Sequence, residues 1–89
     1  MNNTIEKNIK ELYKKQSILL KPIIYIGKYG ISKNVLYEIN KQLKNKKLIK
    51  IKVLKKEKVD IKKIALDLEL ICKANLINLI GHTIVLYKK

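Results

Sequence analysis

The fold of this chain is decided by the stretch IIYIGKYGIS at residues 23–32. Its first four residues are a continuous apolar run that predicts a short buried strand, and Ser32 is a good N-cap for a following helix. Between the strand and the helix, Gly27 and Gly30 allow a sharp turn and let a ligand approach the backbone closely. The helix beyond the turn offers free N–H groups and a positive dipole end, so the arrangement suits a phosphate group.

Helical periodicity is present on both sides of this stretch. A first helix is expected from a cap at Asn3 or Thr4, and Pro22 ends any helical continuation before the strand. The helix capped by Ser32 is expected to end near residues 45–47. Asp60 can cap a third helix, whose apolar stripe reaches Cys72.

Strand patterns follow each of the two later helices. Residues 48–54 alternate in period two, with three β-branched residues on one face and Lys50 and Lys52 on the other. A polar connection follows at residues 55–58. The chain ends in two apolar stretches, 76–80 and 83–87, whose link Gly81-His82 fits a type II′ hairpin turn.

These elements predict one α/β domain over residues 1–89, with the order α-β-α-β-α-β-β. Helices that link consecutive strands imply parallel pairing with right-handed crossovers, and the final hairpin adds an antiparallel pair. We therefore expect a mixed four-stranded sheet with three helices.

The charge balance predicts a polyanionic partner. Of 89 residues, 21 are basic and 7 acidic, which gives a formal net charge of +14, and every basic residue is a lysine. Hydrophobic residues make up 47%, so the chain is expected to fold despite its charge. Lysine is a point charge that neutralises phosphates. It lacks the planar guanidinium group with which arginine forms two hydrogen bonds to the edge of a guanine base. We expect recognition of a nucleic-acid backbone rather than of base sequence.

Other classes of function lack their sequence signals. There is no paired-carboxylate motif, no metal-ligand spacing, and no phosphate-binding Walker loop, and Cys72 is the only cysteine. We expect no enzyme activity, no metal or other cofactor and no small-molecule substrate. No apolar stretch reaches the length of a membrane span and no signal peptide is evident, so we expect a cytoplasmic protein without a membrane partner.

Four segments together resemble a known family: LKP at 20–22, IGKYGIS at 26–32, LIKIKV at 48–53 and GHTIVLYK at 81–88. They are similar, in order and spacing, to the chloroplast RNA splicing and ribosome maturation (CRM) domain, whose free-standing members are called YhbY-like. The resemblance implies an RNA-binding module with a fold akin to the C-terminal domain of translation initiation factor three. It also implies a role in assembly of the large ribosomal subunit, as for bacterial members.

The candidate RNA-binding residues are the glycine loop and selected lysines. The family's loop falls on Gly27, Lys28, Tyr29 and Gly30, and the further candidates are Lys33, Lys21, Lys46, Lys47, Lys50 and Lys52. Each has a plain structural alternative. The two glycines can be present solely because the chain turns there, and alternating lysines can simply form the solvent-exposed face of a strand. A G-x-x-G loop also clamps nucleotides in KH domains, but there it joins two helices, whereas here it follows a strand.

The function that these observations favour is non-catalytic binding of ribosomal RNA by a monomer that acts as an assembly factor. Two alternatives share the size and the basicity. One is an Alba-like dimeric chromatin protein that coats DNA or RNA, and the other is an integral ribosomal protein.

Overall fold

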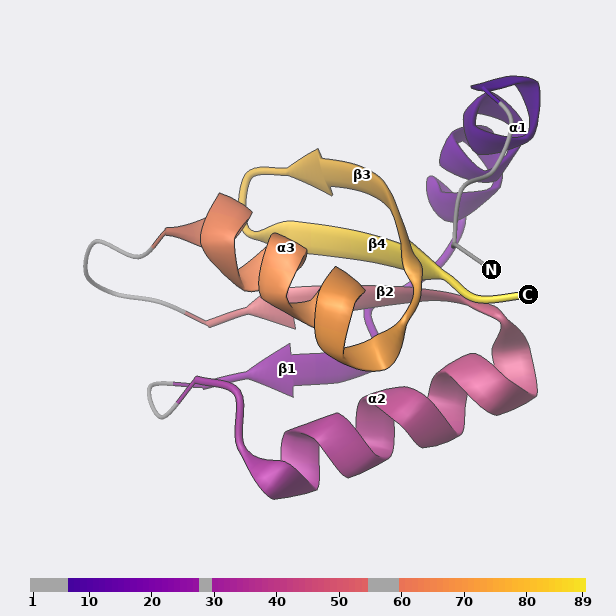
Figure 1. The fold of residues 1–89 in the computed structure, drawn as a ribbon. Coiled ribbons are helices and arrows are strands. Elements are labelled where there is room, and N and C mark those ends of the chain that lie inside the picture. Colours follow the sequence, from indigo (N-terminus) through magenta and orange to yellow (C-terminus); the bar gives the residue numbers. More distant parts are fainter. Residues whose placement is uncertain (1–6, 28–29, 55–59) are drawn as a thin grey trace.

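The computed structural model describes residues 7–27, 30–54 and 60–89, and Figure 1 shows the arrangement of their helices and strands. The expected caps of the first helix, Asn3 and Thr4, and the polar connection at 55–58 lie outside these ranges. The predicted element order is confirmed. The elements are α1 (Lys7–Ser17), β1 (Ile24–Ile26), α2 (Lys33–Lys46), β2 (Leu48–Val53), α3 (Ile61–Cys72), β3 (Asn75–Ile80) and β4 (Thr83–Tyr87).

The predicted caps of α2 and α3 and the predicted hairpin turn are also confirmed. The Ser32 hydroxyl accepts a hydrogen bond from the Val35 N–H at 3.1 Å, and the Asp60 carboxylate accepts one from the Lys63 N–H at 3.0 Å. Each bond satisfies one of the free donors in a first helical turn. Gly81 has φ +56, while His82 is not among the residues with positive φ, which is the type II′ pattern.

The strand order corrects one expectation. The sheet runs β1-β2-β4-β3, so β1 and β2 pair in parallel as predicted, but β4 lies between β2 and β3. The reason is the apolar content of β4, where Ile84, Val85 and Leu86 are all buried. A strand that is buried on both faces belongs in the middle of a sheet, whereas β3 exposes Ile80 and suits an edge.

The core lies between one face of the sheet and the helices α2 and α3, which lie on the same side of the sheet in Figure 1. Ile39 and Leu43 of α2 and Leu68 of α3 are almost fully buried. They meet the buried side chains of the strands, which include Ile26, Ile49, Ile51, Val53, Ile84 and Leu86. The three buried residues of β2 are those that the period-two pattern assigned to the packed face.

Helix α1 contacts β2 and β3 and lies apart from α2 and α3 (Figure 1). The Tyr13 ring of α1 stacks on the Tyr87 ring of β4, with ring centroids 4.2 Å apart and an interplanar angle of 23°. Tyr87 follows the core residue Leu86, so strand alternation places it on the opposite face of the sheet. Helix α1 therefore covers one end of the sheet face that α2 and α3 leave free. None of the helices in the described ranges combines the length and apolarity needed to cross a bilayer.

Candidate nucleic-acid interface

The glycine turn connects the end of β1 to the start of α2. The Gly30 N–H donates a hydrogen bond to the Gly27 carbonyl at 3.0 Å, which closes a four-residue turn. The candidate residues Lys28 and Tyr29, between these glycines in sequence, lie outside the described ranges. Gly30 has φ +71, a conformation that strongly favours glycine. The positive φ that this turn requires is therefore enough to explain why residue 30 is glycine.

Gly27 has no such internal explanation. Its φ is not positive, and a Cβ built on it would meet nothing within 4 Å among the described residues. Gly27 is exposed and lies directly beyond the buried Ile26. Neither backbone strain nor close packing inside the described protein requires glycine here. A ligand that approaches the backbone closely would require it.

The N-terminus of α2 adds a positive end to this turn. Its first turn contains no acidic residue, its cap Ser32 is neutral, and Lys33 is exposed at the first helical position. By contrast, the anionic Asp60 caps α3. Among the described residues, the free N–H groups and the positive dipole end of α2 therefore have no carboxylate cap, a setting that attracts an anion.

Three further candidate lysines, Lys21, Lys50 and Lys52, occupy different positions. Lys52 is exposed on β2 and pairs in register with Tyr25 of β1. The Lys50 Nζ is half-buried and donates a hydrogen bond to the Leu20 carbonyl at 3.1 Å, so this ammonium already has a partner in the protein. Lys21 is exposed but precedes β1, whereas the glycine turn follows it. An extended chain of that length spans roughly 20 Å, so nearness in sequence does not bring Lys21 to the turn.

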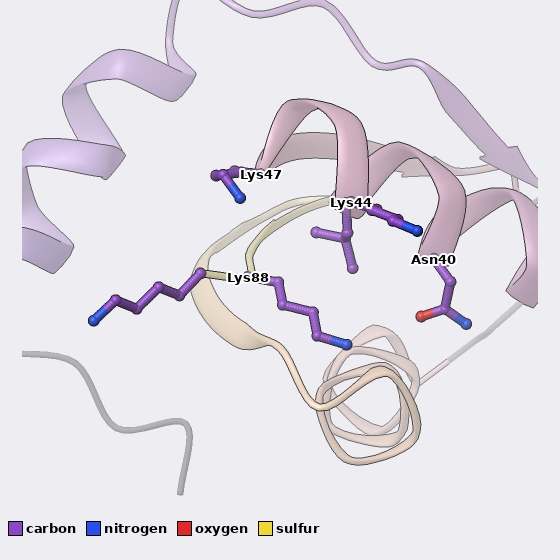
Figure 2. Close-up of a pocket in the computed structure, with 6 residues that line it drawn as sticks. Asn40, Lys44, Lys47 and Lys88 are labelled. Atoms are coloured by element: carbon purple, nitrogen blue, oxygen red, sulfur yellow. The ribbon is translucent and has the colours of Figure 1, made fainter.

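Lys46 and Lys47 lie at the far end of α2, about 21 Å from the glycine turn for a helix of this length. Lys47 belongs to a hollow of about 330 Å³, which we call the lysine pocket (Figure 2). Figure 2 shows lysine side chains from α2 and from the C-terminal segment around this hollow. The pocket is lined by Asn40, Leu43, Lys44, Lys47, Lys88 and Lys89.

Backbone hydrogen bonds hold the lysine pocket together. The Lys47 N–H donates to the Leu43 carbonyl at 2.9 Å, and the Lys47 carbonyl accepts from the Lys88 N–H at 2.9 Å. The Lys88 charge also acts on Cys72 at the end of α3: burial raises the pKa of this thiol, and Lys88 opposes the increase. The lining contains four lysines and no acidic residue, a composition that suits a bound anion.

Sequence reasoning missed two features of this surface. The apolar run at residues 23–26 predicts a buried strand, but the side chain of Tyr25 within it is 52% exposed, because β1 is an edge strand and this residue faces away from the helices. Lys44, Lys88 and Lys89 were not recognised as neighbours of Lys47. The pairing of Leu48 with Tyr87 brings Lys47 beside Lys88, and only a correct β2–β4 register would have revealed it.

In the described ranges, no three His, Cys, Asp or Glu side chains gather into a group that could hold a metal ion. The fold and surface define a small basic α/β module with a glycine turn at one end of its sheet. The family model described as the CRS1/YhbY (CRM) domain matches residues 5–88, and the chain belongs to this family.

Three similar proteins have RNA binding in their names. A probable RNA-binding protein of Methanocaldococcus jannaschii, MJ0652, is 34% identical over 82 residues, which cover 90% of this chain and 60% of that protein. The probable RNA-binding protein YqeI of Bacillus subtilis is 37% identical over 70 residues, 79% of this chain and 73% of that one. The solution structure of the hypothetical protein SAV1595 from Staphylococcus aureus, described as a candidate RNA-binding protein, matches with a TM-score of 0.84 at 31% identity. The match between the two structures covers 97% of this chain and 90% of the SAV1595 chain.

Proposed function

We propose that this protein binds RNA through the phosphate backbone, without catalysis, and that the glycine turn is its principal contact. Gly27 carries the proposal, because nothing in the described protein requires glycine at this exposed position. The adjacent α2 N-terminus and Lys33 supply the positive charge that a phosphate needs. Family membership and the names of the relatives support RNA as the partner.

Replacing Gly27 with alanine separates a ligand contact from a structural role. The free energy of unfolding is expected to stay the same or rise by up to about 1 kcal/mol, because the added methyl group enters open space at a φ that is not positive and restricts the unfolded chain. RNA affinity is expected to fall roughly five-fold or more, since the methyl group keeps a phosphate from the backbone N–H groups and about 1 kcal/mol of contact energy is lost. Thermal melting and fluorescence anisotropy with a labelled structured RNA measure the two quantities.

The double variant Lys28→Ala/Tyr29→Ala complements this test, because it removes a cation and a stackable ring from the loop without altering either glycine. It should also lose RNA affinity several-fold at unchanged thermal stability. Full RNA affinity in both variants would remove the glycine turn from the mechanism.

We infer that the lysine pocket is a second phosphate contact of the same RNA. The glycine turn and the pocket lie at opposite ends of α2, about 21 Å apart. Successive phosphates of one strand advance only about 3.4 Å along a duplex axis, so one rigid helix would contact phosphates several nucleotides apart. A folded RNA offers such separated phosphates more readily than a short flexible strand.

A matched pair of glycine substitutions tests the lysine pocket. Lys47 and Lys73 follow α2 and α3, have φ +68 and +53, and are both exposed. Replacing either lysine with glycine removes one charge and relieves a positive φ, so both variants are expected to be at least as stable as the parent. Only Lys47→Gly is expected to lower RNA affinity, roughly three-fold or more, in a filter-binding titration. Equal losses in both variants would show that total charge, not the pocket, governs binding.

The proposed target is ribosomal RNA, and the proposed process is assembly of the large subunit in the cytoplasm by a monomeric factor. Family membership and the excess of lysine support this assignment. Crosslinking in cells followed by sequencing of the attached RNA tests the target, and sedimentation of the protein with immature large subunits tests the process.

Stoichiometric presence on finished subunits would indicate an integral ribosomal protein. A dimer that binds duplex DNA as tightly as RNA would indicate the Alba-like alternative.

A further inference from the structure

Among the residues that the structure describes, no helix covers the sheet face opposite α2 and α3 at the end nearest the glycine turn. Helix α1 covers the other end, where Tyr13 stacks on Tyr87 and Tyr87 pairs with Leu48. From Leu48, strand β2 continues four residues to Lys52, a distance of about 13 Å. Lys52 is exposed, so the free end of this face is accessible.

A row of four side chains crosses the sheet at this open end. The register pairs Tyr25 with Lys52, Lys52 with Thr83, and Thr83 with Ile80. The flanking residues Ile51, Val53 and Ile84 are buried on the helix side, so alternation places the whole row on the opposite face. We call these four residues the sheet row.

The sheet row combines apolar surface with positive charge. The Tyr25 side chain is 52% exposed and Ile80 is 63% exposed, while Lys52 between them is a cation. The row contains no acidic residue. An exposed aromatic ring beside a lysine is a surface on which a nucleobase can stack while its phosphate meets the ammonium group. An acidic or purely apolar protein partner would leave either the ring or the charge unused.

The sheet row is continuous with the proposed phosphate site. Tyr25 is two residues before Gly27, and the Leu54 N–H donates a hydrogen bond to the Ile26 carbonyl at 2.7 Å. The hairpin turn lies at the same end, because the Val53 N–H donates to the His82 carbonyl at 2.8 Å. An RNA strand whose backbone is bound at the glycine turn would place its next bases over the sheet row.

We propose that the sheet row, with Tyr25 as its stacking residue, binds an unpaired base of the RNA adjacent to the glycine turn. This inference rests on the proposed function and adds that the bound segment is single-stranded at this point. Base stacking tolerates different bases, so it is compatible with a protein that recognises the backbone rather than sequence. Paired bases inside a duplex have no free face for Tyr25.

The test compares two exposed side chains, Tyr25 and Leu70, and two kinds of oligonucleotide. Tyr25→Ala is expected to weaken binding of a single-stranded oligoribonucleotide roughly 5- to 30-fold, the effect of losing one stacked base. Tyr25→Phe keeps the ring and should bind within about two-fold of the parent protein, because stacking does not need the hydroxyl group. Leu70→Ala is the control, because Leu70 is 78% exposed but lies on α3, which carries none of the proposed contacts. It should bind as the parent does.

An abasic oligonucleotide of the same length separates stacking from charge. The parent and Tyr25→Ala should bind it equally, because it has phosphates but no bases. Equal binding of the normal oligonucleotide by Tyr25→Ala and the parent, or an equal loss on both oligonucleotides, would overturn the inference. A loss of self-association in Tyr25→Ala, with RNA binding unchanged, would assign the row to a second copy of this chain. If Gly27→Ala weakens RNA binding and Tyr25→Ala does not, the stacking inference is wrong but the proposed RNA-binding function stands. If the parent protein binds no RNA, both the proposed function and the stacking inference are wrong.

Discussion

RNA affinity is expected to fall roughly 50- to 300-fold when monovalent salt rises from about 50 to about 200 mM. This effect follows from counterion release, in which each phosphate neutralised by a lysine frees a condensed cation. The glycine turn and the lysine pocket together provide on the order of four to six phosphate contacts, and for single strands this number gives a logarithmic slope of about −3 to −4. Titrations at several salt concentrations, at constant pH, give the slope directly.

The variants of the two contact sites sharpen the salt experiment. Lys47→Gly should make the slope shallower by somewhat less than one unit, because one phosphate contact is lost. Lys73→Gly should leave it unchanged. A slope near zero for the parent protein would contradict binding through the phosphate backbone.

The largest expected effect on stability is that of Ile51→Ala. Ile51 is fully buried in β2, and its register partners Ile24 and Ile84 flank it in the same core. Truncation leaves a cavity between the sheet and the helices, which is expected to cost about 2–5 kcal/mol of the free energy of unfolding. For a domain of this size the melting temperature should fall by roughly 10–30 °C. Calorimetry or circular dichroism measures both quantities.

The neighbouring substitution Lys52→Ala is the control for this prediction. It lies on the same strand but faces solvent, so the free energy of unfolding should change by less than about 0.5 kcal/mol. Similar losses of stability in Ile51→Ala and Lys52→Ala would contradict the assignment of the two faces of β2.

The element order was predictable because the local signals agree with one another. Ser32 and Asp60 both form the caps that their residue types favour, and the alternation in β2 separates buried isoleucines from exposed lysine as its pattern indicates. The position of β4 was not predictable from connectivity, because α3 links β2 to β3 in sequence without making them neighbours. The apolar run of β4 suits a central strand, but the burial of Ile84, Val85 and Leu86 is a property of the assembled sheet.

The candidate site was predictable only where it is local in sequence. Gly27, Gly30 and Lys33 follow one another along the chain and therefore lie at one end of the sheet. Lys47 and Lys88 are far apart in sequence, and the antiparallel register that joins them is a property of the tertiary fold. The exposure of Tyr25 was not predictable, because an apolar run does not reveal which strand is at the edge of the sheet. Its exposure follows from the sheet order.

The most direct measurement of the central claim is an NMR titration of the ¹⁵N-labelled protein with a structured RNA, read at each backbone amide. The account predicts the largest shifts at Gly27, Gly30 and Lys33, with a second group at Lys47 and Lys88. The amides along the middle of α3 should change little. Shifts confined to α3, with the glycine turn and the lysine pocket unaffected, would contradict the account.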